Sequence, residues 1–234
     1  MYCRRARKKP FLTKVHIARR KAWAEGLQTW TMADWSKIIW TDEMSFEIGK
    51  DSRVTRVWRE AGEEYAPKNL ALTFKSGRAS LMVWGCIAFG MRGLLVRMLK
   101  GGHNTLNYIA NILNRPLEKF YLEVKAARGD AYVVEDGAPV HTAKVSQKWR
   151  EDHAIKTFPH PSRSPDLNAI EHVWSQLKNN VNNRLVRPRS VEEAEAALFE
   201  EWEKLDLGFI NSLANSMPDR VKAVLEAGGR STKY

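Results

Sequence analysis

The sequence predicts an α/β fold in which one mixed β-sheet carries helices on its two faces. Two observations indicate this fold. In the first half of the chain, apolar and β-branched segments follow one another in the manner of an antiparallel meander. From about residue 104 onward, helical segments alternate with short strands, an order typical of sheets with helical crossovers.

The expected elements of the first half begin with a helix over residues 13–29, for which Thr13 is the N-cap. Apolar or β-branched runs then predict strands at residues 37–43, 54–58, 81–89 and 94–99. Residues 50–79 contain two glycines, Gly62 and Gly77, and Pro67, and are expected to include a long excursion from the meander.

In the second half, a helix is expected over residues 104–127, with a break near Pro116. Further elements are expected as a strand at 131–136, a helix at 141–151, a strand at 155–159, a helix at 166–182 and helices over 190–226 punctuated by Gly208 and Pro218. The 166–182 helix is amphipathic, and its apolar stripe consists of Leu167, Ile170, Trp174, Leu177 and Val181.

The composition excludes several classes of protein. The chain has 234 residues, enough for one large domain with its own core. Its two cysteines, Cys3 and Cys86, make no disulfide framework or zinc ribbon. The longest uncharged apolar run, residues 81–91, is shorter than the roughly 20 residues that span a bilayer. No apolar segment follows the basic N-terminus, so a secretory signal is not expected.

The positive charge is concentrated at the N-terminus. The net charge is +11, and nine of the 38 basic residues, but no acidic residue, lie within residues 1–21. A cationic arm on a nearly neutral globule favours contact with nucleic acid phosphates or a nuclear address. A solvated arm without a partner is the alternative. The arm residues considered for DNA binding are Arg4, Arg5, Arg7, Lys8 and Lys9.

Acidic residues end two of the predicted strands, and a third acid lies on the 166–182 helix, more than one turn after its start. Asp42 ends the first strand, Asp136 ends the strand at 131–136, and Glu171 lies at the edge of the apolar stripe. Burying such acids is costly unless a cation compensates them. Mg²⁺ prefers oxygen ligands, and a pair of ions can promote phosphoryl transfer. Each acid taken alone could equally be a turn, cap or surface residue. Glu43 and Glu135 should point to the opposite face and are interpreted as bystanders.

Three motifs carry a resemblance to a known family. WTDE (40–43), EDGAPVHTA (135–143) and SPDLNAIEHVW (164–174) resemble the catalytic motifs of mariner-type DDE transposases, the Tc-mariner superfamily. The 34 residues between Asp136 and Glu171 resemble the Tc branch. The resemblance runs from about residue 10 to about residue 215. Other segments that resemble the family are KPFLTK (9–14), RVWREAGEEY (56–65) and MVWG (82–85).

The resemblance implies a ribonuclease H-like fold and two Mg²⁺ ions, replaceable by Mn²⁺, held by Asp42, Asp136 and Glu171. It implies an enzyme that cuts double-stranded DNA at transposon ends and joins the freed 3′-hydroxyl to target DNA, without a covalent protein intermediate. A homodimer is the candidate assembly, and the nucleus is the expected location. Family members usually carry a helix-turn-helix domain before the catalytic domain. This chain begins in what resembles the linker, so we expect a catalytic domain without that DNA-binding domain.

Several residues near the three acids are weaker candidates for DNA contact. His141 follows Asp136 by five residues and could contact a phosphate at a helix N-terminus or simply cap its turn. Lys178 lies two turns after Glu171, and Arg163 precedes the same helix; each could contact a phosphate or be a solvated cation. His172 is interpreted as structural. Asn168 is expected to organise the helix start.

The expected organisation has three parts. Residues 1–30 form a basic linker arm and helix, residues 31–188 form the catalytic domain, and residues 189–234 form a helical extension packed on that domain. Residues 50–79 are a candidate clamp loop within the catalytic domain. Two other functions remain open at this stage. One is a catalytically inactive DNA-binding or assembly module derived from a transposase, and the other is a ribonuclease H-like nuclease acting on RNA–DNA hybrids.

Overall fold

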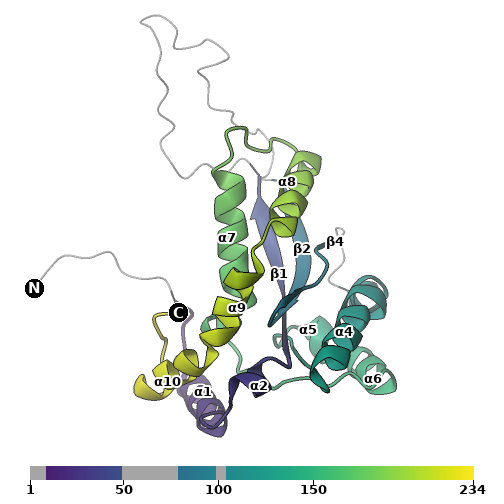
Figure 1. Ribbon diagram of the computed structural model, residues 1–234. Coiled ribbons are helices and arrows are strands. Elements are labelled where there is room, and N and C mark those ends of the chain that lie inside the picture. The colour runs from purple at the N-terminus through teal and green to yellow at the C-terminus, as the bar shows by residue number, and fades with distance from the viewer. Residues whose placement is uncertain (1–8, 49–78, 99–103) are drawn as a thin grey trace, which may run out of the picture.

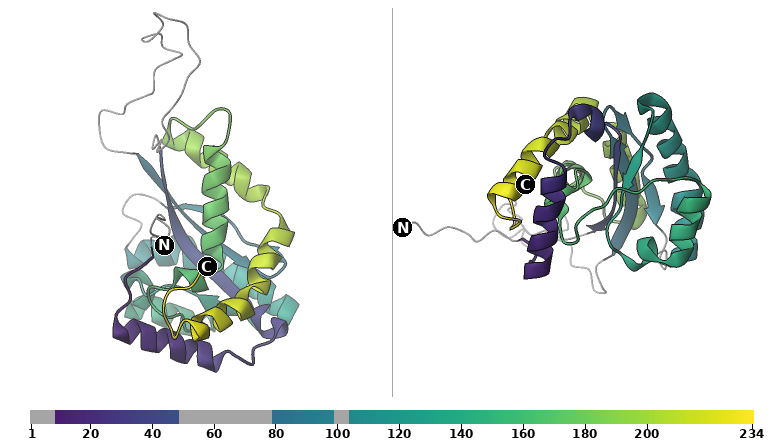
Figure 2. Two further views of the ribbon diagram at one scale, coloured as in Figure 1. Left: turned by 90° about the vertical axis from the view of Figure 1, so that its left-hand side faces the viewer. Right: turned by 90° about the horizontal axis from the view of Figure 1, so that it is seen from below.

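The structure is a computed structural model that describes residues 9–48, 79–98 and 104–234. The predicted strand at 54–58 and nearly all of the candidate clamp loop lie outside the described residues. The described segments form one mixed sheet with helices on both faces (Figures 1 and 2). Among these segments, no helix is long and apolar enough to cross a membrane.

The sheet has β1 (Ile38–Glu47) near its centre. On one side β1 pairs antiparallel with β2 (Ser80–Ala88), which in turn pairs antiparallel with β3 (Met91–Arg92) and β4 (Val96–Met98). On its other side β1 pairs parallel with β5 (Tyr132–Val134). The antiparallel meander followed by a parallel strand is the predicted mixed sheet.

Alternation along the central strands separates two apolar cores. Ile38 and Trp40 of β1 face the first core, whereas Ile39 faces the second. The helices that contribute to the first core are α1 (Lys14–Gly26), α2 (Met32–Trp35), α7 (Ile170–Asn182), α8 (Val191–Glu203), α9 (Leu207–Asn215) and α10 (Met217–Glu226). The second core is formed with α3 (Thr105–Tyr108), a π-helix (Ile109–Leu117) and α4 (Glu118–Arg128).

Several predicted helices are confirmed with adjusted bounds. Thr13 caps α1, because its hydroxyl accepts a hydrogen bond from the backbone N–H of His16 (3.3 Å). The predicted 141–151 helix is split into α5 (Pro139–Thr142) and α6 (Lys144–Asp152). A 3-10 turn (Pro165–Leu167) precedes α7, and the predicted apolar stripe of that helix is buried. In the C-terminal region, Asp206 caps α9, and Pro218 lies in the first turn of α10.

Two local predictions are wrong. The helix over 104–127 does not break at Pro116, because this residue is enclosed in the π-helix, which leads directly into α4. A π turn shifts the hydrogen-bond pattern and can so tolerate a residue without an N–H. The predicted strand at 155–159 is reduced to a parallel bridge between Val133 and Thr157. Its backbone still bonds β5, since Phe158 N–H donates to the Val133 carbonyl (2.7 Å).

A buried ion pair joins the two ends of the described chain to the turn before α7. Arg20 of α1 donates from both terminal nitrogens to the two oxygens of Asp166 (2.7 Å each), and the side chains are 1% and 7% exposed. Arg20 Nε also donates to the Gly229 carbonyl (3.0 Å), and Arg220 of α10 donates to the Asp166 carbonyl (2.8 Å). Arg20 is therefore a structural residue rather than part of a solvated basic arm.

We expect Arg20→Met to destabilise the protein by about 3–5 kcal/mol, because it leaves the Asp166 carboxylate buried without its partner. Urea unfolding followed by circular dichroism measures the change. Lys21→Met is the control, since Lys21 forms an exposed pair with Glu25 (3.6 Å) whose loss should cost no more than about 0.5 kcal/mol. Equal stability of the two variants would contradict this role of the buried pair.

Candidate active site

The three predicted carboxylates come from β1, the loop after β5 and α7, and Asp42 does not end its strand as predicted, because β1 continues to Glu47. Asp42 lies within β1, Asp136 lies two residues beyond the end of β5, and Glu171 is in the first turn of α7. Trp40 pairs with Val134 in the parallel ladder, so Asp42 and Asp136 each lie two residues beyond the same pair. The sheet register thus brings the two aspartates to one edge, as expected for ligand sites in such sheets.

Side-chain hydrogen bonds of Thr41 and Asn168 fix these elements to one another. The Thr41 hydroxyl donates to the Val134 carbonyl (2.7 Å), which joins β1 to β5 directly before the two aspartates. Asn168 donates from its amide nitrogen to the Thr41 carbonyl (3.1 Å). The Asn168 carbonyl accepts from the backbone N–H of Glu171 (3.3 Å), which confirms that Asn168 organises the start of the helix.

Burial and, in addition, neighbouring acids raise the pKa values of Asp42 and Glu171. Burial raises the pKa of Asp42 to about 8, with the charges of Glu171 and Glu43 as the next largest causes. Asp136 adds a smaller contribution in the same direction. Burial also raises the pKa of Glu171, an effect that Lys178 opposes and Asp136 reinforces. An ionised Asp42 at this position needs compensating positive charge.

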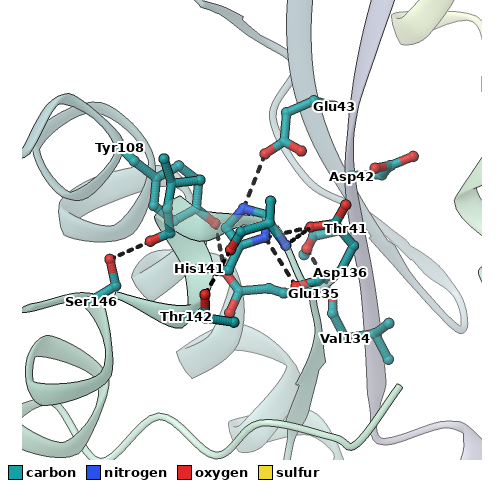
Figure 3. Close-up of polar contacts among 12 residues, drawn as sticks. Thr41, Asp42, Glu43, Tyr108, Val134, Glu135, Asp136, His141, Thr142 and Ser146 are labelled. Atoms are coloured by element: carbon teal, nitrogen blue, oxygen red, sulfur yellow. Dashed lines mark hydrogen bonds and ion pairs between the residues drawn. The ribbon is translucent and has the colours of Figure 1, made fainter. Parts of the chain in front are cut away.

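Asp136 is held by a buried histidine (Figure 3). Its Oδ1 atom accepts from the Ala138 backbone N–H (2.9 Å) and lies 2.8 Å from His141 Nδ1. The His141 hydrogen bond is the main reason that the pKa of Asp136 is lowered. Burial alone would lower the pKa of His141, but its contacts with Asp136 and Glu43 outweigh burial and raise that pKa to about 10. His141 is therefore cationic near neutral pH.

The far side of His141 contacts a second set of charged residues. Its Nε2 atom lies 3.4 Å from Glu43 Oε1. Glu135 accepts from the Tyr108 hydroxyl (2.6 Å) and pairs with Arg150 (2.9 Å), which also donates to the His141 carbonyl. As predicted, Glu43 points to the face opposite Asp42 (Figure 3). The interpretation of Glu43 and Glu135 as bystanders is wrong, because both belong to the buried network around His141.

The structure separates the candidates for DNA contact. Of the two roles considered for His141, the structure favours the one within the turn, because the residue is 4% exposed and its ring contacts Asp136 and Glu43. Lys178 is partly exposed on α7, and its charge acts on Glu171. Arg163 is exposed before α7, where its guanidinium donates to the Phe11 carbonyl (3.5 Å). Lys9 is exposed and donates to the Tyr234 carbonyl. The other predicted arm residues, Arg4, Arg5, Arg7 and Lys8, lie outside the described residues.

The helix that carries Glu171 is also held on its outer side. The guanidinium of Arg220 lies 3.3 Å from His172 Nδ1, in agreement with a structural role for His172. Burial, followed by the charges of Arg220 and Lys9, lowers the pKa of His172. The two adjacent residues of α7 thus have separate tasks, because Glu171 faces the carboxylates and His172 faces α10.

The chemistry of the three carboxylates fits hard divalent cations, since all donors are oxygens and the pKa of Asp42 is raised by burial and then by the other acids. Across the described ranges, no three His, Cys, Asp or Glu side chains are gathered closely enough to chelate a metal ion. One reason is that Asp136 is turned to His141 and the Ala138 N–H. The assignment of the three carboxylates as metal ligands stays a prediction.

Comparison with known proteins decides the family. The model of the DDE superfamily endonuclease family matches residues 37–193 of the chain. The chain belongs to this family. The Tc1 transposase of Caenorhabditis elegans is 32% identical over 234 residues, covering 100% of this chain and 84% of the relative. The Tcb1 transposase of Caenorhabditis briggsae is 31% identical with the same coverages.

Solved structures agree with this DDE family assignment at the level of the fold. The catalytic domain of Mos1 mariner transposase aligns with a TM-score of 0.74 and 18% identity, over 97% of this chain and 100% of that one. A pre-cleavage Mos1 transpososome aligns with a TM-score of 0.79 over 100% of this chain and 68% of that one. The predicted ribonuclease H-like fold and Tc-mariner family are confirmed, and the chain is a DDE transposase catalytic domain.

The raised pKa of Asp42 predicts a pH dependence of stability in metal-free protein. Asp42 has a pKa of about 8 when folded, against about 3.9 for an unfolded Asp. Between these values the folded state binds the extra proton, so the free energy of unfolding falls as pH rises, by at most about 1.4 kcal/mol per pH unit. Asp42→Asn should remove this term and be more favourable relative to wild type at about pH 8 than at about pH 5. Urea unfolding in the presence of a chelator measures the difference, and a pH-independent difference would contradict it.

Proposed function

We propose that Asp42, Asp136 and Glu171 bind two Mg²⁺ ions, or Mn²⁺ in their place, and cut and join DNA through them. The observation that carries the proposal is the raised pKa of Asp42, which results from its burial beside other acids. A protein that keeps such a buried carboxylate within its sheet incurs an electrostatic cost, which divalent cations would offset. When bound, the ions supply an activated oxygen nucleophile and stabilise the leaving oxygen in phosphoryl transfer.

The residues of the chain would perform distinct tasks around this centre. Asp42 and Glu171 would hold the ions together with Asp136, and the charge of Glu171 already acts on the buried Asp42 carboxylate. Thr41 and Asn168 keep β1, β5 and α7 in a fixed relation. Asp136 would exchange its hydrogen bond to cationic His141 for contact with the metals. Such preorganisation supplies the positioning on which phosphoryl transfer depends.

Double-stranded DNA is the proposed substrate, both as transposon ends and as target. Solved structures similar to this chain include a Mos1 paired-end complex with the left transposon end and a Mos1 strand transfer complex. The Mos1 catalytic domain also has structures with Mg and with Mn, which support divalent metals here. Lys178, Arg163, Lys9 and the basic arm are the proposed phosphate contacts. We also propose that the protein acts as a homodimer and is located in the nucleus. The nuclear location rests on the basic arm.

Substitution of each carboxylate tests the proposed centre. We expect Asp42→Asn, Asp136→Asn and Glu171→Gln each to abolish Mg²⁺- or Mn²⁺-dependent nicking of plasmid DNA and to weaken metal binding measured by calorimetry. Asp152→Asn is the control, because Asp152 pairs with Lys148 on exposed α6 (3.0 Å) and should retain both properties. Full nicking activity in any of the three variants would refute the assignment of that residue. Salt-sensitive DNA binding without nicking in the wild type would instead support an inactive DNA-binding module.

The proposed phosphate contact of Lys178 has its own measurement. Lys178→Ala should weaken binding of unrelated DNA duplexes to a similar degree and reduce the slope of log affinity against log salt by about 1. Lys222→Ala on α10 is the matched control, because Lys222 is exposed and pairs only loosely with Glu226 (4.0 Å). Fluorescence anisotropy at several salt concentrations gives both slopes. Identical slopes for the wild type and the Lys178 variant would remove this residue from the interface.

A further inference from the structure

The carboxylate of Asp42 receives a hydrogen bond from a buried tryptophan. Trp174 donates from its indole nitrogen to Asp42 Oδ2 (3.2 Å), and its side chain is 3% exposed. Trp174 lies on α7, about one turn after Glu171. The same short helix segment therefore presents one carboxylate of the proposed centre and contacts another.

A glycine opposite Asp42 makes this contact sterically possible. Gly85 of β2 is the direct partner of Asp42 in the antiparallel ladder, so the two residues share one face of the sheet. A Cβ atom at Gly85 would lie 2.8 Å from Trp174 Cη2 and 3.0 Å from Trp202 Cη2. The space that a side chain at position 85 would fill is occupied by the two indoles. Trp174 can therefore approach β2 closely and reach the carboxylate of Asp42.

A second tryptophan fixes the first. The rings of Trp174 and Trp202 stack with centroids 5.6 Å apart and an interplanar angle of 28°. Trp202 in turn donates from its indole nitrogen to the Gly93 carbonyl (3.0 Å). Trp174 is thus confined between β2 and α8, which leaves its N–H little freedom to point elsewhere.

The hydrogen-bonding chemistry of indole is suited to orienting the Asp42 carboxylate. An indole nitrogen donates one hydrogen bond and accepts none, so it can orient a carboxylate without competing as a metal ligand. It uses one of the lone pairs of the Asp42 carboxylate, which can accept at both oxygens, so further lone pairs stay available to a cation. Hydrogen-bond partners of metal-binding carboxylates commonly determine their orientation and contribute strongly to metal affinity.

We propose that Trp174 is a positioning residue that holds the Asp42 carboxylate in its metal-binding orientation, with Gly85 and Trp202 providing the space and the support for the indole. This inference rests on the proposed function, because it assumes that Asp42 is a metal ligand. Trp174 itself touches neither metal nor DNA in this proposal. It acts only through Asp42.

Metal titration of matched variants tests the proposal. In calorimetry with Mg²⁺ on the full chain, Trp174→Phe should bind the ion about 10-fold more weakly than wild type or worse, because it keeps an aromatic ring but loses the donor. Trp149→Phe is the control, because it also removes an indole donor, one that bonds Asn114 Oδ1 (2.7 Å) and not Asp42, and it should bind as wild type does. Asp42→Asn should lose the ion. Circular dichroism establishes that each variant is folded.

A second readout uses the wild-type chain and so does not depend on the folding of a variant. The chain has nine tryptophans, and their indole N–H signals can be assigned in an isotope-labelled sample by proton–nitrogen NMR. We expect the Trp174 indole signal to shift with Mg²⁺ along the same saturation curve as the calorimetry. The Trp202 signal, whose N–H donates to a backbone carbonyl, should move little. In Asp42→Asn the Mg²⁺ response of Trp174 should disappear.

The outcomes separate this inference from the proposed function. Unchanged Mg²⁺ affinity in a folded Trp174→Phe, with binding lost in Asp42→Asn, overturns the positioning role and leaves the proposed metal centre intact. A Trp174 indole signal that does not respond to Mg²⁺, while the ion binds, overturns it as well. Absence of Mg²⁺ binding in wild type, or equal binding in wild type and Asp42→Asn, refutes the metal centre itself and the positioning role with it.

Discussion

The two hydrogen bonds of Thr41 connect the elements on which the whole site depends. Its hydroxyl joins β1 to the last residue of β5, and its carbonyl receives the Asn168 side chain from the turn before α7. Asp42, Asp136 and Glu171 follow within a few residues of these three attachment points. An ordinary parallel ladder would fix only the two strands. The Asn168 bond adds the helix, so the three carboxylates keep their relation even though they repel one another.

Strand alternation divides the support of the site between the two faces of the sheet. On the first core side, Trp174 donates to Asp42. On the second core side, cationic His141 is held between Asp136 and Glu43. The two aspartates are therefore supported by different layers and by different kinds of donor, one neutral and one charged. The Arg20–Asp166 pair adds a third support, since it anchors the turn before α7 to α1 and α10.

The sequence predicted the mixed sheet, its helices on both faces and the family, because these depend on local periodicity and on short motifs. Thr13 as a cap and Asn168 as an organiser of α7 were also predictable, since each acts within a few residues of itself. The environment of His141 was not, because Tyr108 of α3 and Glu43 of β1 reach it from elements distant in the sequence. The helix break predicted at Pro116 was wrong. Proline usually interrupts a helix, whereas the turns around Pro116 adopt a π-helical conformation. The ligand roles of the three acids stay predictions until a metal is measured.

Close packing around Gly85 constrains which residues related sequences can have at this position and around it. Its missing side chain is the volume into which both Trp174 and Trp202 project. A larger residue at position 85 would be tolerated only if one of the two indoles became smaller, so the three positions should vary together among related sequences. Gly85→Ala, which adds a single methyl group to β2, could thus inactivate a transposon copy with all three carboxylates unchanged.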